Sequence, residues 1–499
     1  MKSCGKDMPS MNRIYKYITF FLILTIIFSF FAACERGEIE TSVETTESTN
    51  SKTESQTVEE VKLSGEKKDY NEDFYMFLHT GFFEYYWVED GGSDAMSEAI
   101  FARQQHVYDH LGVNLIAKSE KQHDAYGNTF MTAVKNKDES IDMMLSNPYM
   151  FIPAFITGGY LSDIGAIDGI DLNADYWHLD VMDQVAINDH YYLGHSDYLI
   201  PHTHVITYNK EMLGQYSDTL NESIYDTVRE YRWTIDKMIS LAQLVYIDKT
   251  ADGKTSDDTF GITGVQWMPF VGFLQACNIQ LVDSNERGEY QVSVYNELNK
   301  ERTVSLVEKL SALSKSEYAY FRYRTEPTET IRIYSGKTLM SLDETFALPK
   351  YLDYGVSFGV LPYPMFDEEQ KNVGYRSLDW NGWICVPSYV KNMALVADTL
   401  ETLAFFSKDV TITFYEKLLG KQVADAPDDR QMLDIVWDSI CSDIGLTYSH
   451  IGGSLDQNLY MLPTVTQANS QEHLVSYVKG YEVSANKLLK KFVKDLENQ

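Results

Sequence analysis

The spacing of apolar residues along the chain predicts strands that alternate with helices. Two short strands, Phe74–Leu78 and Val113–Ile116, flank a segment, Met96–Leu111, whose apolar residues recur at helical spacing. Because parallel strands need long crossover connections, this order predicts an α/β fold with mostly parallel sheets. Further strands are expected at Asp142–Leu145, Val205–Tyr208, Phe260–Thr263, Thr338–Leu342, Val356–Leu361 and Trp383–Val386.

The two ends of the chain have patterns of their own. Residues 1–33 begin with basic side chains and continue into the uncharged run Tyr17–Ala33, which is typical of an export signal. Residues 34–69 are rich in Ser, Thr and Glu, so they should form a solvated, disordered tether. At the other end Leu488, Phe492 and Leu496 recur every four residues, which predicts a C-terminal helix.

The end of the apolar run suggests a lipid anchor. Phe31-Ala32-Ala33-Cys34 resembles the lipobox of bacterial lipoproteins, which implies cleavage before Cys34 and lipidation of that cysteine. An uncleaved N-terminal anchor helix is the alternative. Either arrangement places the body on the outer face of the cytoplasmic membrane, because the basic residues stay in the cytoplasm.

Charge and length narrow the function classes. The 499 residues include 42 basic and 73 acidic side chains, which gives a formal charge of −31. Such a surface repels phosphate backbones and anionic lipid headgroups, so nucleic acid is excluded as a partner. A chain of this length, with 44% hydrophobic residues, should fold as two to four globular units.

Metal and redox chemistry have little support. Cys277, Cys385 and Cys441 lack metal-ligand spacing and are expected to be buried free thiols, although a disulfide between two of them stays open. His106 and His110 share a helix face without a third ligand. Residues 248–253 fit a calcium loop only in part, because Thr259 replaces the final Glu. We therefore expect no metal and no cofactor.

A series of short motifs resembles the family 1 extracellular solute-binding proteins of bacterial ABC importers, over nearly all of the chain from Phe74 onward. The strongest is Tyr208–Leu213 (YNKEML), followed by Trp233–Asp236 (WTID). The other matching segments, in order, are Ser97–Val113, Ser140–Ser146, Tyr160–Asp163, Asp171–Trp177, Ile187–Tyr192, Gly336–Met340 and Val360–Pro364.

The resemblance implies two discontinuous α/β lobes joined at a hinge, with a ligand cleft between them. Lobe 1 would comprise residues 70–204 and 362–409, and lobe 2 residues 205–361 and 410–499. Ligands of open α/β sheets bind beyond the carboxyl ends of strands, and closure of the lobes would trap them.

Residues at strand ends are therefore the candidate ligand contacts. A sugar needs flat aromatic platforms for its C–H faces and polar groups for its hydroxyls. We expect Trp267 and Trp380 to stack on the ligand, and Asp343 and Glu344 to bind hydroxyl groups. The full candidate set is Thr80, Gly81, Ser146, Asn147, Trp267, Asp343, Glu344, Trp380 and Trp383. Core packing or a surface loop is the alternative for each of them.

These observations predict a monomeric, lipid-anchored receptor that catalyses nothing. It would capture a small polar ligand, expected to be a mono- or oligosaccharide, for the transmembrane subunits of an ABC importer. The alternative is a cell-surface carbohydrate-active hydrolase with paired carboxylates. The sequence contains no GxSxG, GxxxxGK[ST] or GxGxxG motif.

Overall fold

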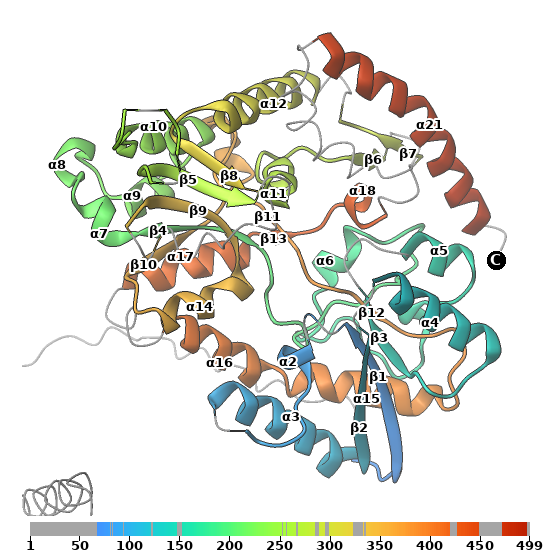
Figure 1. Cartoon of the computed structure of the whole chain (residues 1–499). Helices are drawn as coiled ribbons and strands as arrows, with labels where there is room; N and C mark the ends of the chain where they lie inside the picture. The colour runs from blue at the N-terminus through green and yellow to red at the C-terminus, as the bar shows by residue number, and fades with distance from the viewer. Residues whose placement is uncertain are drawn as a thin grey trace, which may run out of the picture. The chain divides into compact units, whose positions relative to one another are not determined.

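The computed structural model describes most of the chain after residue 66 (Figure 1). The described residues are 67–79, 81, 83–92, 94–120, 123–146, 152–251, 253–255, 257–265, 268–284, 289–294, 299–322, 333, 336–419, 427–448 and 472–496. The predicted signal, Cys34 and nearly all of the predicted tether lie outside this part. Within it, no helix combines the length and the apolarity needed to cross a membrane.

The first sheet has four strands in the order β12-β3-β1-β2. Strand β1 (Glu72–His79) runs parallel to β2 (Val113–Glu120) and to β3 (Met143–Leu145), whereas β12 (Ile384–Cys385) is antiparallel to β3. The predicted strands in these four regions are confirmed. Since β12 begins 239 positions after the end of β3, this sheet is built from two distant parts of the chain.

The predicted helix between β1 and β2 is confirmed as α3 (Ala95–Leu111). The Asp94 side chain accepts the backbone N–H of Met96 at 3.0 Å and caps the first turn. Gly112 ends the helix in the left-handed region, with φ 63°, where glycine pays no steric penalty. The helix lies beside β2 and α15 (Met393–Phe405) (Figure 1).

The second sheet has five strands in the order β10-β4-β9-β5-β8. Strands β5 (Phe260–Val265), β8 (Ala319–Arg322) and β9 (Thr338–Glu344) are parallel to one another. Strand β4 (His204–Asn209) runs antiparallel to β9 and to β10 (Phe358–Leu361). Strands β10, β9, β5 and β8 therefore point the same way, so the sheet is mostly parallel as expected, and only β4 runs against its neighbours.

The remaining elements cover the two sheets or connect them. They are α2 (Phe83–Tyr86), α4 (His123–Asn136), α5 (Ile152–Thr157), η1 (Ile164–Ala166), α6 (Leu179–Asp183), α7 (Lys210–Gly214), α8 (Ser217–Leu220), α9 (Ile224–Arg229), α10 (Ile235–Val245), α11 (Met268–Ala276), β6 (Val282–Ser284), β7 (Tyr290–Val292), α12 (Lys300–Lys315), η2 (Thr345–Ala347), α14 (Leu348–Asp353), η3 (Glu368–Asn372), β11 (Ser377–Leu378), α16 (Lys408–Leu419), α17 (Pro427–Asp438), β13 (Ile440–Cys441), α18 (Ile444–Thr447) and α21 (Glu472–Leu496).

Residues 379–383 connect β11 to β12 and therefore lead back into the first sheet. Before this connection, residues 362–378 pack beside elements of the second sheet: Met365 bonds to the backbone of Trp233, and Gln370 bonds to the carbonyl of Ala276. Residues 362–378 therefore pack with the second sheet up to the connection at residues 379–383.

The hydrophobic core extends through both sheets. The largest cluster of buried side chains includes Phe77 and Met144 of the first sheet together with Ile206 and Leu342 of the second. The three described cysteines are free and buried, as predicted. They are far from ionisation at neutral pH, since burial raises the pKa of Cys385 to about 12.

The C-terminal helix is confirmed, but its buried face differs from the expected one. Leu489 and Phe492 are buried, whereas Leu488 is 41% exposed. At the other end, Lys68 already belongs to the packed body, although it lies within the predicted tether. Its backbone N–H donates to the carbonyl of His110 at 3.1 Å, and its ammonium group pairs with Asp398 at 2.6 Å.

Gly382 offers a test of how tightly β12 is joined to β3. A Cβ atom at this position would lie 1.8 Å from the carbonyl oxygen of Ser146. Gly382→Ala should therefore lower the free energy of unfolding by about 1–3 kcal/mol, measured by urea denaturation. Gly214→Ala is the control, because a Cβ there meets no atom within 4 Å. An equal effect of both substitutions would contradict the steric argument.

Candidate functional site

The register of two antiparallel strands places several predicted residues at one edge of the second sheet. His204, the first residue of β4, lies opposite Glu344, the last residue of β9, and Val205 lies opposite Asp343. Strand β5 is parallel to β9, so it ends at the same edge. This edge therefore carries the carboxyl ends of parallel strands, the usual ligand position in open α/β sheets.

Asp343 is held by two hydroxyl groups. The Thr207 hydroxyl donates to Oδ2 of Asp343 at 2.5 Å, and the Tyr351 hydroxyl donates to the same oxygen. Burial, and then the nearby Asp343 carboxylate, hold the pKa of Tyr351 well above its usual value, so this tyrosine stays a donor. Asp343 is partly exposed and its carboxylate has a defined orientation.

Glu344 is paired with a buried histidine. Nε2 of His202 lies 3.3 Å from Oε2 of Glu344, and the two side chains are 1% and 28% exposed. The His202 ring stacks on Phe346, with a centroid separation of 4.0 Å and an interplanar angle of 6°. The carbonyl of His202 also accepts the backbone N–H of Trp380 at 2.7 Å. One residue thus fixes both the carboxylate of Glu344 and the backbone of Trp380.

The Trp380 ring lies against a second buried histidine. The rings of Trp380 and His204 are 4.5 Å apart at 66°, and Trp380 itself is partly exposed. Burial lowers the pKa of His204 to about 4, so its ring is neutral at pH 7. Neither ring nitrogen of His204 has a hydrogen-bond partner among the described residues, and the same holds for the hydroxyl of neighbouring Tyr363.

The candidates of the first sheet are mostly packed. Trp383 is 2% exposed, and its backbone N–H donates to the Ser146 hydroxyl at 3.0 Å. The Ser146 N–H donates to the carbonyl of Trp383 at 2.8 Å. These contacts are typical of core positions. Gly81, just after β1, is exposed, and its N–H donates to Nδ1 of His79 at 3.2 Å.

The structure therefore places Asp343, Glu344 and Trp380 at the same edge of the second sheet, with the side chains of Asp343 and Glu344 directed to opposite faces of it. Ser146 and Trp383 are buried beside the first sheet. Thr80, Asn147 and Trp267 lie outside the described residues, so their roles stay predictions.

Sequence reasoning missed the residues that position this edge. His202, His204, Thr207 and Tyr351 are absent from the predicted set of ligand contacts. A usable signal was present, since Thr207 is a polar residue inside the otherwise apolar strand Val205–Tyr208. Its partner Asp343 could be identified only from the strand register.

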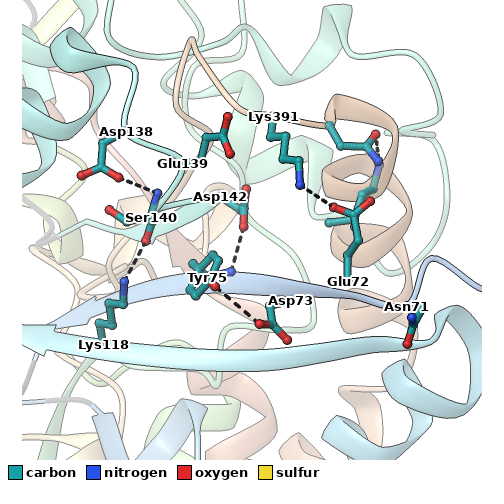
Figure 2. A pocket seen from close by; sticks show the side chains of 12 residues that line it. Asn71, Glu72, Asp73, Tyr75, Lys118, Asp138, Glu139, Ser140, Asp142 and Lys391 are labelled. Atoms are coloured by element: carbon teal, nitrogen blue, oxygen red, sulfur yellow. Dashed lines mark hydrogen bonds and ion pairs between the residues drawn. The ribbon is translucent and has the colours of Figure 1, made fainter.

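A separate pocket of about 520 Å³ opens at the start of β1, at the opposite end of that strand from Gly81 (Figure 2). Its charged side chains are largely bonded within the pocket. Lys391 pairs with Glu72 at 3.3 Å, and the Asp142 carboxylate accepts the N–H of Tyr75 at 2.8 Å. Burial raises the pKa of Asp142 to about 6. This pocket does not lie at the edge of the second sheet that carries Asp343 and Glu344.

The weak metal motifs gain no support from the structure. No group of three or more His, Cys, Asp or Glu side chains within the described part is arranged to hold a metal ion. The His106 ring stacks on Phe406 at 4.5 Å. The Asp248 carboxylate accepts backbone N–H groups of Thr250 and Ala251, as in an ordinary turn.

Comparison with known proteins identifies the fold. No protein-family model matches the chain, and no curated protein sequence matches it. Among solved structures, an ABC substrate-binding protein of Listeria monocytogenes in complex with cycloalternan matches with a TM-score of 0.53 at 13% identity, covering 83% of this chain and 98% of that one.

Two further structures agree. A solute-binding protein of an ABC transporter from Thermotoga lettingae, bound with α-D-tagatose, has a TM-score of 0.53 at 14% identity and covers 84% of this chain and 100% of its own. A maltose/maltodextrin-binding domain from Bdellovibrio bacteriovorus, bound to maltotriose, has a TM-score of 0.50 at 12% identity, with coverages of 86% and 100%. These matches confirm the predicted two-lobed α/β fold of the solute-binding proteins.

The buried, neutral His204 makes a specific prediction about stability and pH. Its folded pKa of about 4 lies below the unfolded value of about 6.5. Between these values the unfolded state binds more protons, so stability falls as the pH drops from 6.5 to 4, by up to about 3 kcal/mol.

His204→Phe keeps an aromatic ring and removes this titration. We compare the free energy of unfolding of the variant with that of wild type, measured by urea denaturation at pH 5 and at pH 7. The difference should favour the variant more at pH 5 than at pH 7. Comparing the two chains at each pH cancels the contributions of the other titrating groups, which both chains share. If the difference in free energy of unfolding is the same at pH 5 and pH 7, His204 is not buried as a neutral ring.

Proposed function

We propose that the chain is an extracytoplasmic solute-binding protein that captures a carbohydrate for an ABC importer. The observation that carries the proposal is the edge of the second sheet on a solute-binding fold, where Trp380 and Glu344 both contact His202 and Asp343 precedes Glu344 in β9. The proteins that it resembles in structure were solved with cycloalternan, α-D-tagatose and maltotriose.

The chemistry of this edge suits a neutral sugar. The partly exposed Trp380 ring offers a flat apolar surface for the C–H face of a pyranose or furanose. Glu344 and Asp343 offer acceptor oxygens for hydroxyl groups, and both carboxylates are already oriented by His202, Thr207 and the Tyr351 hydroxyl. Side chains held in place before binding lose less entropy when the ligand arrives.

The same geometry favours binding over hydrolysis. Asp343 and Glu344 are consecutive residues of β9, so their side chains leave the strand toward opposite faces. A glycosidase needs two carboxyl groups that flank one glycosidic bond. We therefore propose a receptor without catalytic activity, in which closure of the lobes around residues 379–383 retains the ligand.

The rest of the proposal concerns cellular context. We propose that Cys34 carries the lipid anchor after signal cleavage and that residues 35–66 act as the tether. The monomeric receptor would present its ligand to the transmembrane subunits of the importer from the outer face of the cytoplasmic membrane.

A thermal-shift screen tests the ligand class directly. The full-length chain, in a detergent without a sugar headgroup, should melt at a higher temperature with its cognate mono- or oligosaccharide. Binding to the folded state alone adds RT ln(1 + [L]/Kd), about 2.7 kcal/mol at a hundredfold excess over Kd. Sugar release from an oligosaccharide during the assay would support the hydrolase instead.

Once a sugar is found, Trp380→Ala should weaken its binding by about 1–3 kcal/mol, roughly five- to 150-fold in Kd, measured by calorimetry. Glu344→Gln should have a similar effect and should reduce discrimination between epimers. Trp87→Ala is the matched control, because that tryptophan contacts Phe83 and the carbonyl of Leu115 at the first sheet. Unchanged affinity in both Trp380→Ala and Glu344→Gln would place the ligand elsewhere.

A further inference from the structure

A row of four titratable side chains leads from the surface to the residue before Trp380. Oδ1 of Asp197 lies 2.8 Å from Nε2 of His178, and Nδ1 of His178 lies 2.8 Å from Nδ1 of His195. Nε2 of His195 then lies 3.3 Å from Oδ2 of Asp379. The first two side chains are 28% and 32% exposed, and the last two only 5% and 1%.

The backbone holds this row in place. The N–H of His178 donates to the carbonyl of His195 at 3.0 Å, and the N–H of Asp197 donates to the carbonyl of Tyr176 at 2.9 Å. The His195 ring also packs edge-on against Trp383, with centroids 5.7 Å apart. The two rings therefore face each other because paired backbone segments carry them.

The atoms of the row allow a proton count. Carboxylate oxygens and bare ring nitrogens are acceptors, so each of the three gaps needs one proton to become a hydrogen bond. Two neutral imidazoles carry only two protons. If both rings are neutral and both carboxylates ionised, one gap holds two facing lone pairs.

Burial makes such an empty gap costly. The gap between His195 and Asp379 is the longest, and neither Nε2 nor Oδ2 has a hydrogen-bond partner among the described residues. Two unpaired acceptors in a site that excludes water would lose the free energy of their desolvation without compensation. A third proton on the rings turns this gap into a buried ion pair and leaves the row with a net charge of −1.

We propose that Asp197, His178, His195 and Asp379 form a proton-binding site in which the two imidazole rings together hold three protons, one more than two neutral histidines carry, and that this proton fastens the connection leading into Trp380. Asp379 is the residue through which it would act. The Asp379 N–H donates to the carbonyl of Cys441 at 2.9 Å, and its Oδ1 accepts the N–H of Asn381 at 3.0 Å.

Other titratable groups near Asp379 are silent over a useful pH range. Burial raises the pKa of Tyr86 well above its usual value and that of Cys441 to about 11, and both sense the Asp379 charge. Asp443, near Cys441, has a pKa raised to about 6 by burial, and Arg376 adds a positive charge on the same side. In the folded chain none of these three shifted groups titrates between pH 7 and pH 8.5, whereas in the unfolded chain the Cys441 thiol begins to ionise toward pH 8.5.

The stability of the full-length chain between pH 7 and pH 8.5 tests the site. In this range the folded chain would hold one proton more than the unfolded chain, so unfolding becomes more favourable as the pH rises, by up to tenfold in the equilibrium constant per pH unit. Asp379→Asn should remove this part of the dependence, since its amide N–H can donate to a neutral His195 while its oxygen still accepts from Asn381. The part due to the buried cysteines, whose thiols ionise more readily in the unfolded chain, should remain in both proteins.

Asp163→Asn is the matched control, because Asp163 bonds to the exposed His190 at 2.8 Å outside the row. It should keep the wild-type pH dependence. Equal slopes for wild type and Asp379→Asn would overturn the proposal.

Nitrogen-15 spectra of the histidine side chains give a second measurement that needs no folded Asp379 variant. At pH 7 the pair His178 and His195 should carry three ring protons, so one ring is protonated on both nitrogens; His178→Gln and His195→Gln assign the signals. Two singly protonated rings would overturn the proposal. Neither measurement uses a sugar. A negative result would therefore not bear on the proposed carbohydrate binding, which the thermal-shift screen tests separately.

Discussion

The antiparallel pairing of β4 with β9 is the constraint on which the candidate site depends. It places His204 beside Glu344 and brings Thr207 close enough to orient Asp343. The segment that enters β4 also carries His202, whose carbonyl holds Trp380. A shift of one residue in this register would turn each of these side chains to the other face of the sheet.

The connection between β11 and β12 is unusually rich in buried polar groups. Asn381 is 2% exposed, yet it donates to the carbonyl of Ile200 and accepts from the Tyr86 hydroxyl. Gly382 lets the backbone approach Ser146 more closely than any side chain would permit. Because buried polar groups are stabilising only when their partners are in place, this connection should have few alternative conformations.

Fold and function rest on different observations in this protein. The solved relatives are 12–14% identical to the chain, so they show the fold and leave the ligand to be argued from the residues themselves. Those residues are an aromatic ring and two oriented carboxylates at a strand edge, backed by a neutral histidine. The proposed ligand class follows from this chemistry, and the proposed proton-binding row links the same connection to pH.

Local patterns in the sequence determined which segments form helices and strands and much of their order along the chain. The helical spacing that ends at Leu111, the apolar run at Phe260–Thr263 and the strand-end pair Asp343 and Glu344 were all readable because neighbouring residues decide periodicity. Only the tertiary structure decided that β4 runs against both neighbours, that Trp383 is buried, and that His195 meets Asp379 across 184 positions of sequence. These outcomes depend on strand register and on burial, which are set by contacts between residues far apart in the chain.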